Sequence, residues 1–440
     1  MLHYPKKGVK MIDLALINCK LVPESKECSI GIEDGKIVSI TKIAPKSEEK
    51  IDIKGNVILP GLIDSHVHFR DPGFPEKETF KSGSEAAAAG GFTTVLDMPN
   101  TNPPTVTKKA FLEKLEIARK KSVVDFGLHA GVGDITEIKK IAELKPASFK
   151  IYMDMVDDEQ LLEIFTEIRR LPQDHIISVH AEDKDTVKEC TDKMKSSGSI
   201  NPEIYADARP PLAEDIAVLK ATSLAKELNS RIHVCHVSTK KSFDLIQEAK
   251  GENCKVTSEI TPHHLFLDVS YFQKCGNFAK TNPPLRDSKY KLGFPELDKI
   301  DIIGTDHAPH NIPEKENNVW EAPSGIPNLE NTLPLLLTKI NQNKMTFGNI
   351  KRLLCEKPAE IFNLKNKGKI AEGMDADFVV VDMKKEGIID PAEFKTNAKY
   401  SPFKGFKVKG MPAMTIAHGN VVVANGEVFE NKGKYVYNHK

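Results

Sequence analysis

Apolar stretches of strand length alternate with amphipathic stretches through the middle of the chain. Short apolar runs bounded by polar or turn residues predict buried strands over 57–69, 93–99, 124–130, 148–154, 176–182, 232–238, 255–261 and 300–306. Apolar residues at helical spacing predict helices over 108–121, 136–144, 159–171, 183–195, 213–228, 242–251, 329–340 and 347–362.

Alternation of strands and helices is typical of a parallel α/β fold. Eight predicted strands favour a closed (β/α)8 TIM-type barrel over residues 57–365. An open, doubly wound sheet is the alternative, but no Gly-rich phosphate-binding turn of the expected kind is found. A barrel predicts that active residues lie at the C-terminal ends of its strands.

Both ends of the chain are rich in short strand patterns instead. Asp34-Gly35 and Asn425-Gly426 are hairpin signals within these ends. The N-terminal strands are too few to fold alone, so we expect them to pair with the C-terminal ones. Residues 1–56 and 366–440 are therefore predicted to form one small composite β domain.

Composition narrows the class of protein. Of 440 residues, 40% are hydrophobic and 28% charged, and 62 Lys and Arg balance 62 Asp and Glu, so neither a basic nucleic-acid surface nor an acidic tail is expected. The seven cysteines are scattered without a C-x-x-C pair, which favours a reducing compartment. Because no run of 18 apolar residues exists, we expect a cytoplasmic protein without a membrane partner.

His66-Val-His68 follows the apolar run that predicts the first barrel strand. Residues two apart on a strand project from the same face, so both imidazoles aim at one point. Two converging imidazoles form half of a transition-metal site. For an isolated His-x-His, two ordinary surface or core histidines would be the better interpretation.

Further ligand types occur at the predicted ends of other strands, namely His180, His236 and Asp306, and strand four carries Lys150 as the candidate bridge. With the two histidines of strand one, the set is too large for a single tetrahedral zinc and suits two bridged ions. Asp306 could hold a metal and also relay a proton. The ammonium of Lys150 cannot bind a cation as it stands, and an ordinary barrel lysine in a salt bridge is the alternative.

Polar residues that are not needed as ligands also follow these strands. Arg70 offers a fork that matches a carboxylate, His310 follows strand eight, and Asn100 and Asn282 each supply a donor and an acceptor. The site therefore suits a small anionic substrate with amide character. For the two asparagines, turn-forming residues before prolines are the alternative.

The chain resembles the class I dihydroorotases of the amidohydrolase superfamily, from about Ile12 into the C-terminal domain. The resemblance is carried by Pro60-Gly-Leu-Ile-Asp-Ser-His-Val-His-Phe-Arg-Asp-Pro-Gly73, Thr93-Thr-Val-Leu-Asp-Met-Pro-Asn-Thr-Asn102, Thr281-Asn-Pro-Pro-Leu-Arg286, Gly304-Thr-Asp-His-Ala-Pro-His310 and Gly325-Ile-Pro-Asn-Leu-Glu330.

This resemblance implies two zinc ions held by His66, His68, His180, His236 and Asp306, with a carboxylated Lys150 and a hydroxide as bridges. Arg70, Asn100 and His310 would bind the substrate carboxylate, Asn282 would line the pocket, and the loop 310–325 would lie over the substrate. Asp306 would be the catalytic proton carrier.

The implied reaction is the reversible cyclisation of N-carbamoyl-L-aspartate to (S)-dihydroorotate and water, the third step of de novo pyrimidine synthesis. A hydantoinase or dihydropyrimidinase, or an allantoinase, is the nearest alternative, and Arg70 is the residue that discriminates. An inactive partner subunit of aspartate transcarbamoylase is a further alternative. Association of an active enzyme with that transcarbamoylase, or a homo-oligomer, is also compatible with the resemblance.

Overall fold

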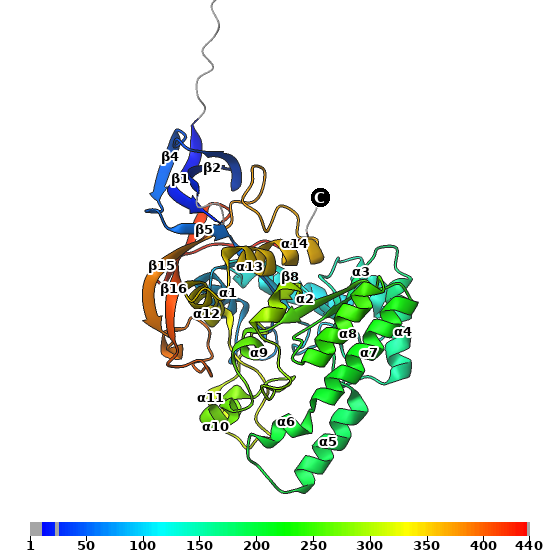
Figure 1. The fold of residues 1–440 in the computed structure, drawn as a ribbon. Coiled ribbons are helices and arrows are strands. Elements are labelled where there is room, and N and C mark those ends of the chain that lie inside the picture. The colour runs from blue at the N-terminus through cyan, green and yellow to red at the C-terminus, as the bar shows by residue number, and fades with distance from the viewer. Residues whose placement is uncertain (1–10, 23–25, 438–440) are drawn as a thin grey trace, which may run out of the picture.

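The structure is a computed structural model that describes residues 11–22 and 26–437. Residues 1–10 of the predicted N-terminal segment, 23–25 and 438–440 lie outside this described part. A β sheet built from both chain ends lies beside a barrel surrounded by helices (Figure 1).

The composite sheet joins the two ends of the chain. Within the described residues it has nine strands in the order β18-β17-β16-β15-β5-β1-β2-β3, with β4 paired to β1. The N-terminal strands are β1 (Ile12–Leu21), β2 (Lys26–Glu33), β3 (Lys36–Thr41), β4 (Ser47–Asp52) and β5 (Val57–Pro60), and the C-terminal strands are β15 (Phe378–Ile388), β16 (Lys407–Ala417), β17 (Asn420–Ala424) and β18 (Glu427–Val428). β5 and β15 pair antiparallel and connect the two groups. The predicted composite β unit is confirmed.

Both predicted hairpin turns are present. Asp34 and Gly35, between β2 and β3, have φ of 50° and 70°. Asn425 and Gly426, between β17 and β18, have φ of 53° and 80°. Positive φ at both central residues matches the turn that follows the twist of antiparallel strands, which explains the Asp-Gly and Asn-Gly pairs.

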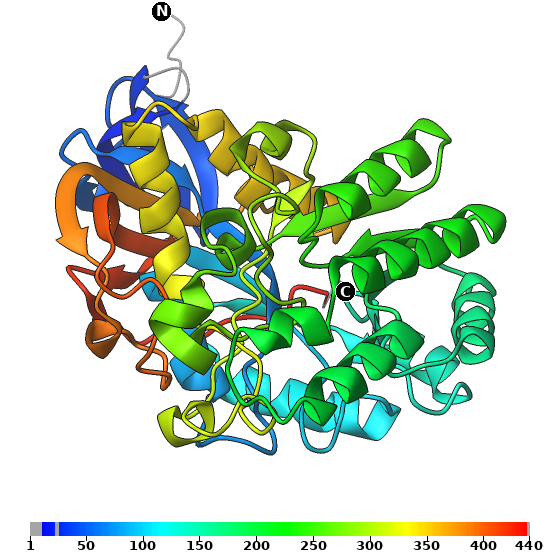
Figure 2. The same ribbon diagram turned by 60° about the horizontal axis from the view of Figure 1, so that its bottom comes forward.

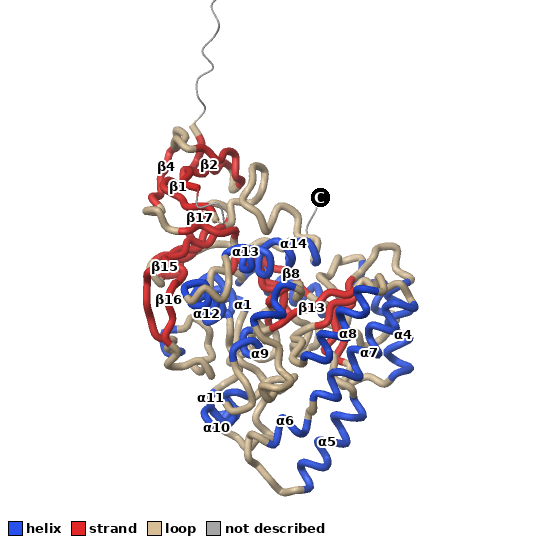
Figure 3. The backbone as a smooth tube through the Cα atoms, viewed as in Figure 1, coloured by secondary structure: helices blue, strands red, loops and turns tan. Residues whose placement is uncertain are grey.

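Each of the eight predicted strand ranges contributes to the barrel. Its strands are β6 (Leu62–Val67), β7 (Phe92–Asp97), β8 (Asp125–Leu128), β9 (Ala130–Gly131), β10 (Phe149–Tyr152), β11 (Ile176–His180), β12 (Arg231–Val234), β13 (Val256–Ile260) and β14 (Ile302–Ile303). β8 and β9 are two parts of the strand predicted over 124–130. The ring closes because the backbone N of His68 donates to the carbonyl of His307 at 2.8 Å. Figure 3 shows these short parallel strands apart from the long composite sheet.

The prediction of one strand over 57–69 is wrong in detail. The run is divided at Gly61 into β5, which pairs with β1 and β15, and β6, which pairs with β7. Hydrophobic pattern could not reveal the division, because both halves are fully buried.

The barrel is covered by helices, seen from the loop-bearing end in Figure 2. They are α1 (Phe80–Ala89), α2 (Lys108–Lys121), α3 (Glu137–Ala142), α4 (Asp158–Arg169), α5 (Lys184–Ser196), α6 (Ile204–Ala208), α7 (Pro211–Glu227), α8 (Lys240–Gly251), α9 (Pro262–Phe266), α10 (Tyr271–Cys275), α11 (Ile312–Lys315), α12 (Leu329–Asn341), α13 (Phe347–Lys351) and α14 (Lys357–Ile361), with 3-10 turns over Gly276–Ala279, Phe294–Asp298 and Pro391–Glu393. None of the described helices is both long and apolar enough to span a bilayer.

Two helical regions differ from the sequence prediction. α1 was missed because its small residues, such as Gly83 and Ala87, weaken any helical apolar pattern. The helix predicted over 347–362 is interrupted by a π-helical turn at Arg352–Glu356, directly before Pro358 at the start of α14. Proline cannot donate the backbone hydrogen bond that a continuous helix would require.

The last described residues leave the composite sheet and run along the barrel. The backbone N of Gly433 donates to the carbonyl of Ser122 at 2.8 Å, and that of Val436 to Phe126 at 3.0 Å. Tyr435 packs on the ring of Phe126 inside the barrel core. The chain end thus supports the barrel strand β8 as well as the composite sheet.

Candidate metal centre and active site

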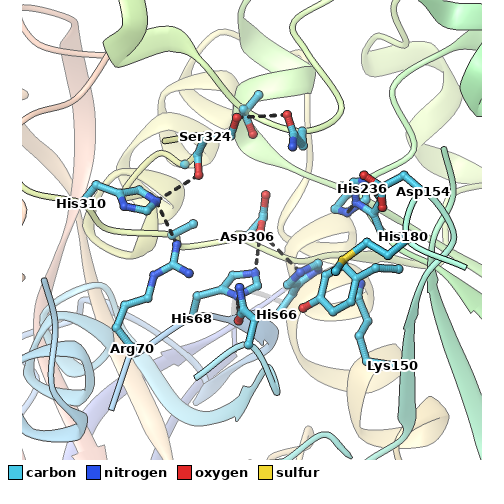
Figure 4. A pocket seen from close by; sticks show the side chains of 17 residues that line it. His66, His68, Arg70, Lys150, Asp154, His180, His236, Asp306, His310 and Ser324 are labelled. Atoms are coloured by element: carbon cyan, nitrogen blue, oxygen red, sulfur yellow. Dashed lines mark hydrogen bonds and ion pairs between the residues drawn. The ribbon is translucent and has the colours of Figure 1, made fainter. Parts of the chain in front are cut away.

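A cavity of about 260 Å³ lies at the C-terminal ends of the barrel strands (Figure 4). Every residue predicted for the site lines it: His66, His68, Arg70, Asn100, Lys150, His180, His236, Asn282, Asp306 and His310. These residues come from segments far apart in the chain, and the parallel barrel gathers them because all its strands end on one rim.

His66, His68 and Asp306 form one compact group. Oδ1 of Asp306 lies 3.1 Å from Nε2 of His68 and 3.4 Å from Nε2 of His66. One ligand atom from each residue lies within 4.8 Å of the others, a spacing that could hold a metal ion. All three side chains are buried, so the group is shielded from competing water.

The outer nitrogen of each histidine has a partner that orients the ring. Nδ1 of His66 lies 2.8 Å from Oε1 of Glu259, and Nδ1 of His68 lies 2.6 Å from Oδ1 of Asn100. Because both partners are acceptors, we assign the hydrogen of each ring to Nδ1. Nε2 of each ring then faces Asp306 and is the atom that a metal ion would take.

The electrostatics of this group favour positive charge between its members. Burial lowers the pKa of His66, but Glu259 and Asp306 raise it more, to about 10. Burial lowers the pKa of His68 to about 4, so that ring is neutral at pH 7. Burial alone would raise the pKa of Asp306, but His66 and His68 hold it below its usual range. A divalent cation fits this donor set.

His180 and His236 form the second half of the centre. Nδ1 of His180 lies 3.0 Å from Nε2 of His236, so two ring nitrogens face each other. Nε2 of His180 lies 2.8 Å from Glu182, which Arg209 contacts at 2.6 Å. Arg209 also contacts Asp154 at 2.6 Å. The acceptor Glu182 fixes the hydrogen on Nε2 of His180, which leaves Nδ1 free to bind a metal.

Lys150 points into the cavity from β10. Its Nζ lies 2.9 Å from Sγ of Cys235 and 5.4 Å from the ring centre of Tyr152. The side chain is 1% exposed, and in the described part of the chain no ion pair of Lys150 is found. The alternative of a lysine engaged in a salt bridge therefore gains no support.

Arg70 and His310 lie together at the other side of the cavity. Nη2 of Arg70 is 3.1 Å from Nε2 of His310, which is also 3.0 Å from the carbonyl of Ser324. Arg70 is buried and, among the described residues, hydrogen bonds to no carboxylate. Asn282 lies beside this wall, where its Oδ1 accepts from Tyr205 at 2.7 Å.

Three of the site residues have a strained backbone. The φ angles of Arg70, His236 and Asp306 are 61°, 38° and 47°. Residues other than glycine rarely adopt this left-handed backbone conformation, which costs about 1–3 kcal/mol for each residue. Strain at residues whose side chains meet in one cavity is typical of functional sites.

The residues around the ligands were not found from the sequence. Glu259 carried one available signal, a carboxylate inside an apolar predicted strand. Arg209 and Ser324 carried none, because both lie in connecting segments. Glu182 lies two residues after His180, but spacing alone does not show that it contacts that ring.

Comparison with known proteins agrees with this geometry. Residues 57–422 match the model of the amidohydrolase family. The chain is similar to a dihydroorotase of Methanothermobacter thermautotrophicus, with 48% identity over 97% of either chain, and to one of Methanosphaera stadtmanae, with 46% identity over 97% of this chain and 100% of that one. Among solved structures, an L-hydantoinase from Arthrobacter aurescens superposes with a TM-score of 0.92 at 34% identity, covering 97% of this chain and 100% of that chain.

The family match spans well over half of the chain, and the relatives cover nearly all of it. The barrel, the histidine-rich rim and the composite sheet are accounted for by a single evolutionary relationship. The chain belongs to the amidohydrolase family.

Proposed function

We propose that this protein is a dihydroorotase, which interconverts N-carbamoyl-L-aspartate with (S)-dihydroorotate and water. The observation that carries the proposal is the buried Arg70 beside His310, in the same cavity as the histidine cluster. A carboxylate on the substrate would give this guanidinium a partner. Similarity to two dihydroorotases over almost the full length supports the same activity.

We propose that the centre holds two divalent cations, which we take to be zinc. Nε2 of His66, Nε2 of His68 and Asp306 would hold one, and Nδ1 of His180 and Nε2 of His236 the other. Lys150, carboxylated by CO₂, would connect the two groups. Such ions polarise a carbonyl and lower the pKa of water.

The chain's own residues supply positioning and proton transfer. Arg70 and His310 hold the substrate carboxylate, and Asn100 can donate from its amide while its oxygen stays on His68. Asp306 is ionised, because its pKa lies below the usual range, so it can accept the proton of the attacking water. It then delivers this proton to the departing ring nitrogen, and ring closure follows the same steps in reverse.

A cyclic amidase with a neutral substrate is the second candidate. It is favoured by the similarity to an L-hydantoinase of Paenarthrobacter aurescens, with 34% identity over 96% of this chain. Hydantoins do not need a carboxylate, so they would leave Arg70 without a charged partner. Leaving a buried charge unpaired is costly, which favours the anionic substrate.

A cytoplasmic location fits the cysteines. All seven are free, including Cys19 and Cys28, which lie opposite each other on β1 and β2. Structural disulfides are rare where glutathione and thioredoxin keep thiols reduced.

The decisive experiment compares substrates on zinc-supplied protein. L-dihydroorotate, hydantoin, dihydrouracil and allantoin are assayed with the parent, with Arg70→Met and with Arg170→Met, an exposed control. We expect activity on dihydroorotate, reduced at least about 30-fold in Arg70→Met with metal content unchanged, because truncating one partner of a buried charge pair costs about 2–5 kcal/mol. Preference of the parent for a neutral ring would refute the assignment.

Carboxylation of Lys150 has its own test. After incubation with ¹³C-labelled bicarbonate, we expect a carbamate carbon resonance in the parent and none in Lys150→Met. Equal spectra from both proteins would remove Lys150 from the centre.

A further inference from the structure

The loop from His310 to Gly325 forms one wall of the cavity. His310 at the start of the loop and Ser324 and Gly325 at its end line the cavity. The short helix α11 lies between these two ends of the loop. Figure 4 shows His310 and Ser324 facing Arg70. The position of this loop therefore decides whether the pocket around Arg70 is complete.

The side chain of Lys315 is buried inside the loop. It is 1% exposed, and its Nζ lies 2.9 Å from the carbonyl of Pro323, 3.0 Å from that of Gly325 and 3.3 Å from that of Lys280. Each carbonyl accepts one of the three ammonium donors. No carboxylate pairs with Lys315 in the part of the chain that is described, so its partners are the backbone of the loop and of residue 280.

Lys280, which lies outside the loop in the sequence, also hydrogen bonds to it. Nζ of Lys280 donates to the carbonyl of Val319 at 2.6 Å and to that of Ala322. The backbone of Lys280 accepts from the N of Gly325 at 2.9 Å. Two buried lysines thus satisfy carbonyls on the second arm of the loop, and Lys315 reaches them from the first arm. This matters because a buried carbonyl without a donor is strongly unfavourable.

We propose that Lys315 is a positioning residue for substrate recognition. Its ammonium keeps the 310–325 loop as a preformed wall that presents His310 and the Ser324 segment to the substrate carboxylate held by Arg70. The recognition part of this inference rests on the proposed function. The alternative is that the loop moves freely as a lid and that Lys315 contributes only packing.

Lysine suits this task because of its chemistry. Methionine matches its length but has no donor, so Lys315→Met removes one hydrogen bond from each of the carbonyls of residues 280, 323 and 325. The first and last of these keep the backbone N of Gly325 and the hydroxyl of Tyr400, whereas the carbonyl of Pro323 loses its lysine partner. Glutamine keeps an amide donor group but no charge, so Lys315→Gln should give an intermediate effect. Lys344→Met, at an exposed lysine in the turn after α12, is the matched control.

The test is hydrogen–deuterium exchange of the zinc-loaded parent and the three variants, with thermal unfolding as a check on folding. We expect amides of 311–325 to exchange about tenfold faster or more in Lys315→Met, the effect of losing one charged hydrogen bond. Lys315→Gln should lie between it and the parent, and Lys344→Met should match the parent. Exchange in β10 to β13 should be unchanged in all four proteins.

Steady-state kinetics test the recognition step. We expect the KM for L-dihydroorotate to rise about tenfold in Lys315→Met, with a smaller change in kcat, because the wall acts in binding. If Lys315→Met does not fold, Lys315→Gln carries both measurements. Exchange equal to the parent in 311–325 would overturn the inference, and so would faster exchange without a change in KM. A parent inactive on dihydroorotate would instead refute the proposed function, whatever the exchange result.

Discussion

Oε1 of Glu259 lies 2.8 Å from Nδ1 of His66, although 193 residues separate the two in the chain. The same oxygen accepts from the backbone N of His236 at 3.1 Å. One buried carboxylate on β13 therefore orients a residue from each half of the proposed metal centre. Burial would raise the pKa of Glu259, but His66 holds it well below its usual range, so the carboxylate is charged.

Glu259→Gln should weaken metal binding by about 10–100-fold, the usual effect of losing the outer partner of a ligating histidine. The side-chain oxygen of glutamine can still accept a hydrogen bond from Nδ1 of His66. Without the negative charge, however, it no longer makes the ring a stronger metal ligand. The measurement is zinc retained after dialysis against a buffered series of free zinc. Glu248→Gln, exposed on α8, is the control, and equal retention in both variants would contradict a role for Glu259.

Gly304→Ala should disturb the same centre from the neighbouring strand. A Cβ at residue 304 would lie 2.2 Å from Oε2 of Glu259, so the carboxylate that contacts His66 must shift. Overpacking of this kind costs about 1–3 kcal/mol in stability. We expect reduced zinc retention with a folded barrel, checked by circular dichroism. Full retention in Gly304→Ala would show that Glu259 can shift without losing His66.

Lys367→Met should destabilise the junction between the barrel and the composite sheet. Nζ of Lys367 lies 2.6 Å from both Asp125 and Asp377 and 3.0 Å from Asp375. Its removal leaves Asp377 without this cation and, among the described residues, leaves Asp125 and Asp375 with only His418 and Lys36 as charged partners. Breaking a buried ion pair in this way costs about 3–5 kcal/mol. The melting temperature should fall well below that of Lys365→Met, an exposed neighbour, while zinc content stays the same. A shift no larger than the control's would show that water replaces the ammonium.

His418→Asn should remove a pH-dependent part of the stability. Burial lowers the pKa of His418, but the hydrogen bond to Asp125 at 2.8 Å raises it above the ordinary value. Because the pKa of His418 is higher in the folded than in the unfolded protein, protonation of its ring stabilises the folded state. This contribution is fully present below the unfolded pKa of about 6.5 and is lost as pH rises through the folded pKa. Asparagine tolerates the φ of 50° at this position.

The melting temperatures of the parent and His418→Asn are therefore compared between pH 5.5 and 9. We expect the difference in melting temperature to be largest at the acidic end, where it corresponds to about 1.5–3 kcal/mol in the free energy of unfolding for a charged hydrogen bond, and to shrink toward pH 9. A constant difference across this range would mean that the imidazole contributes through packing alone.

Local patterns determined much of the fold and the site. The apolar run before His66-Val-His68 predicts a strand, and a period of two places both imidazoles on one face. Strand ends also mark Lys150, His180 and Asp306, because parallel barrel strands finish on a common rim. The Asp-Gly and Asn-Gly turns follow from backbone sterics, which depend only on neighbouring residues.

Contacts between distant segments were decided by the tertiary structure alone. The division of 57–69 at Gly61 depends on pairing of β5 with β15, more than 300 residues later. The partnerships of His66 with Glu259 and of Lys315 with the carbonyls of residues 280, 323 and 325 likewise require the closed barrel. Sequence periodicity reports which face of an element is buried, but the identity of the group packed against that face is set by the fold as a whole.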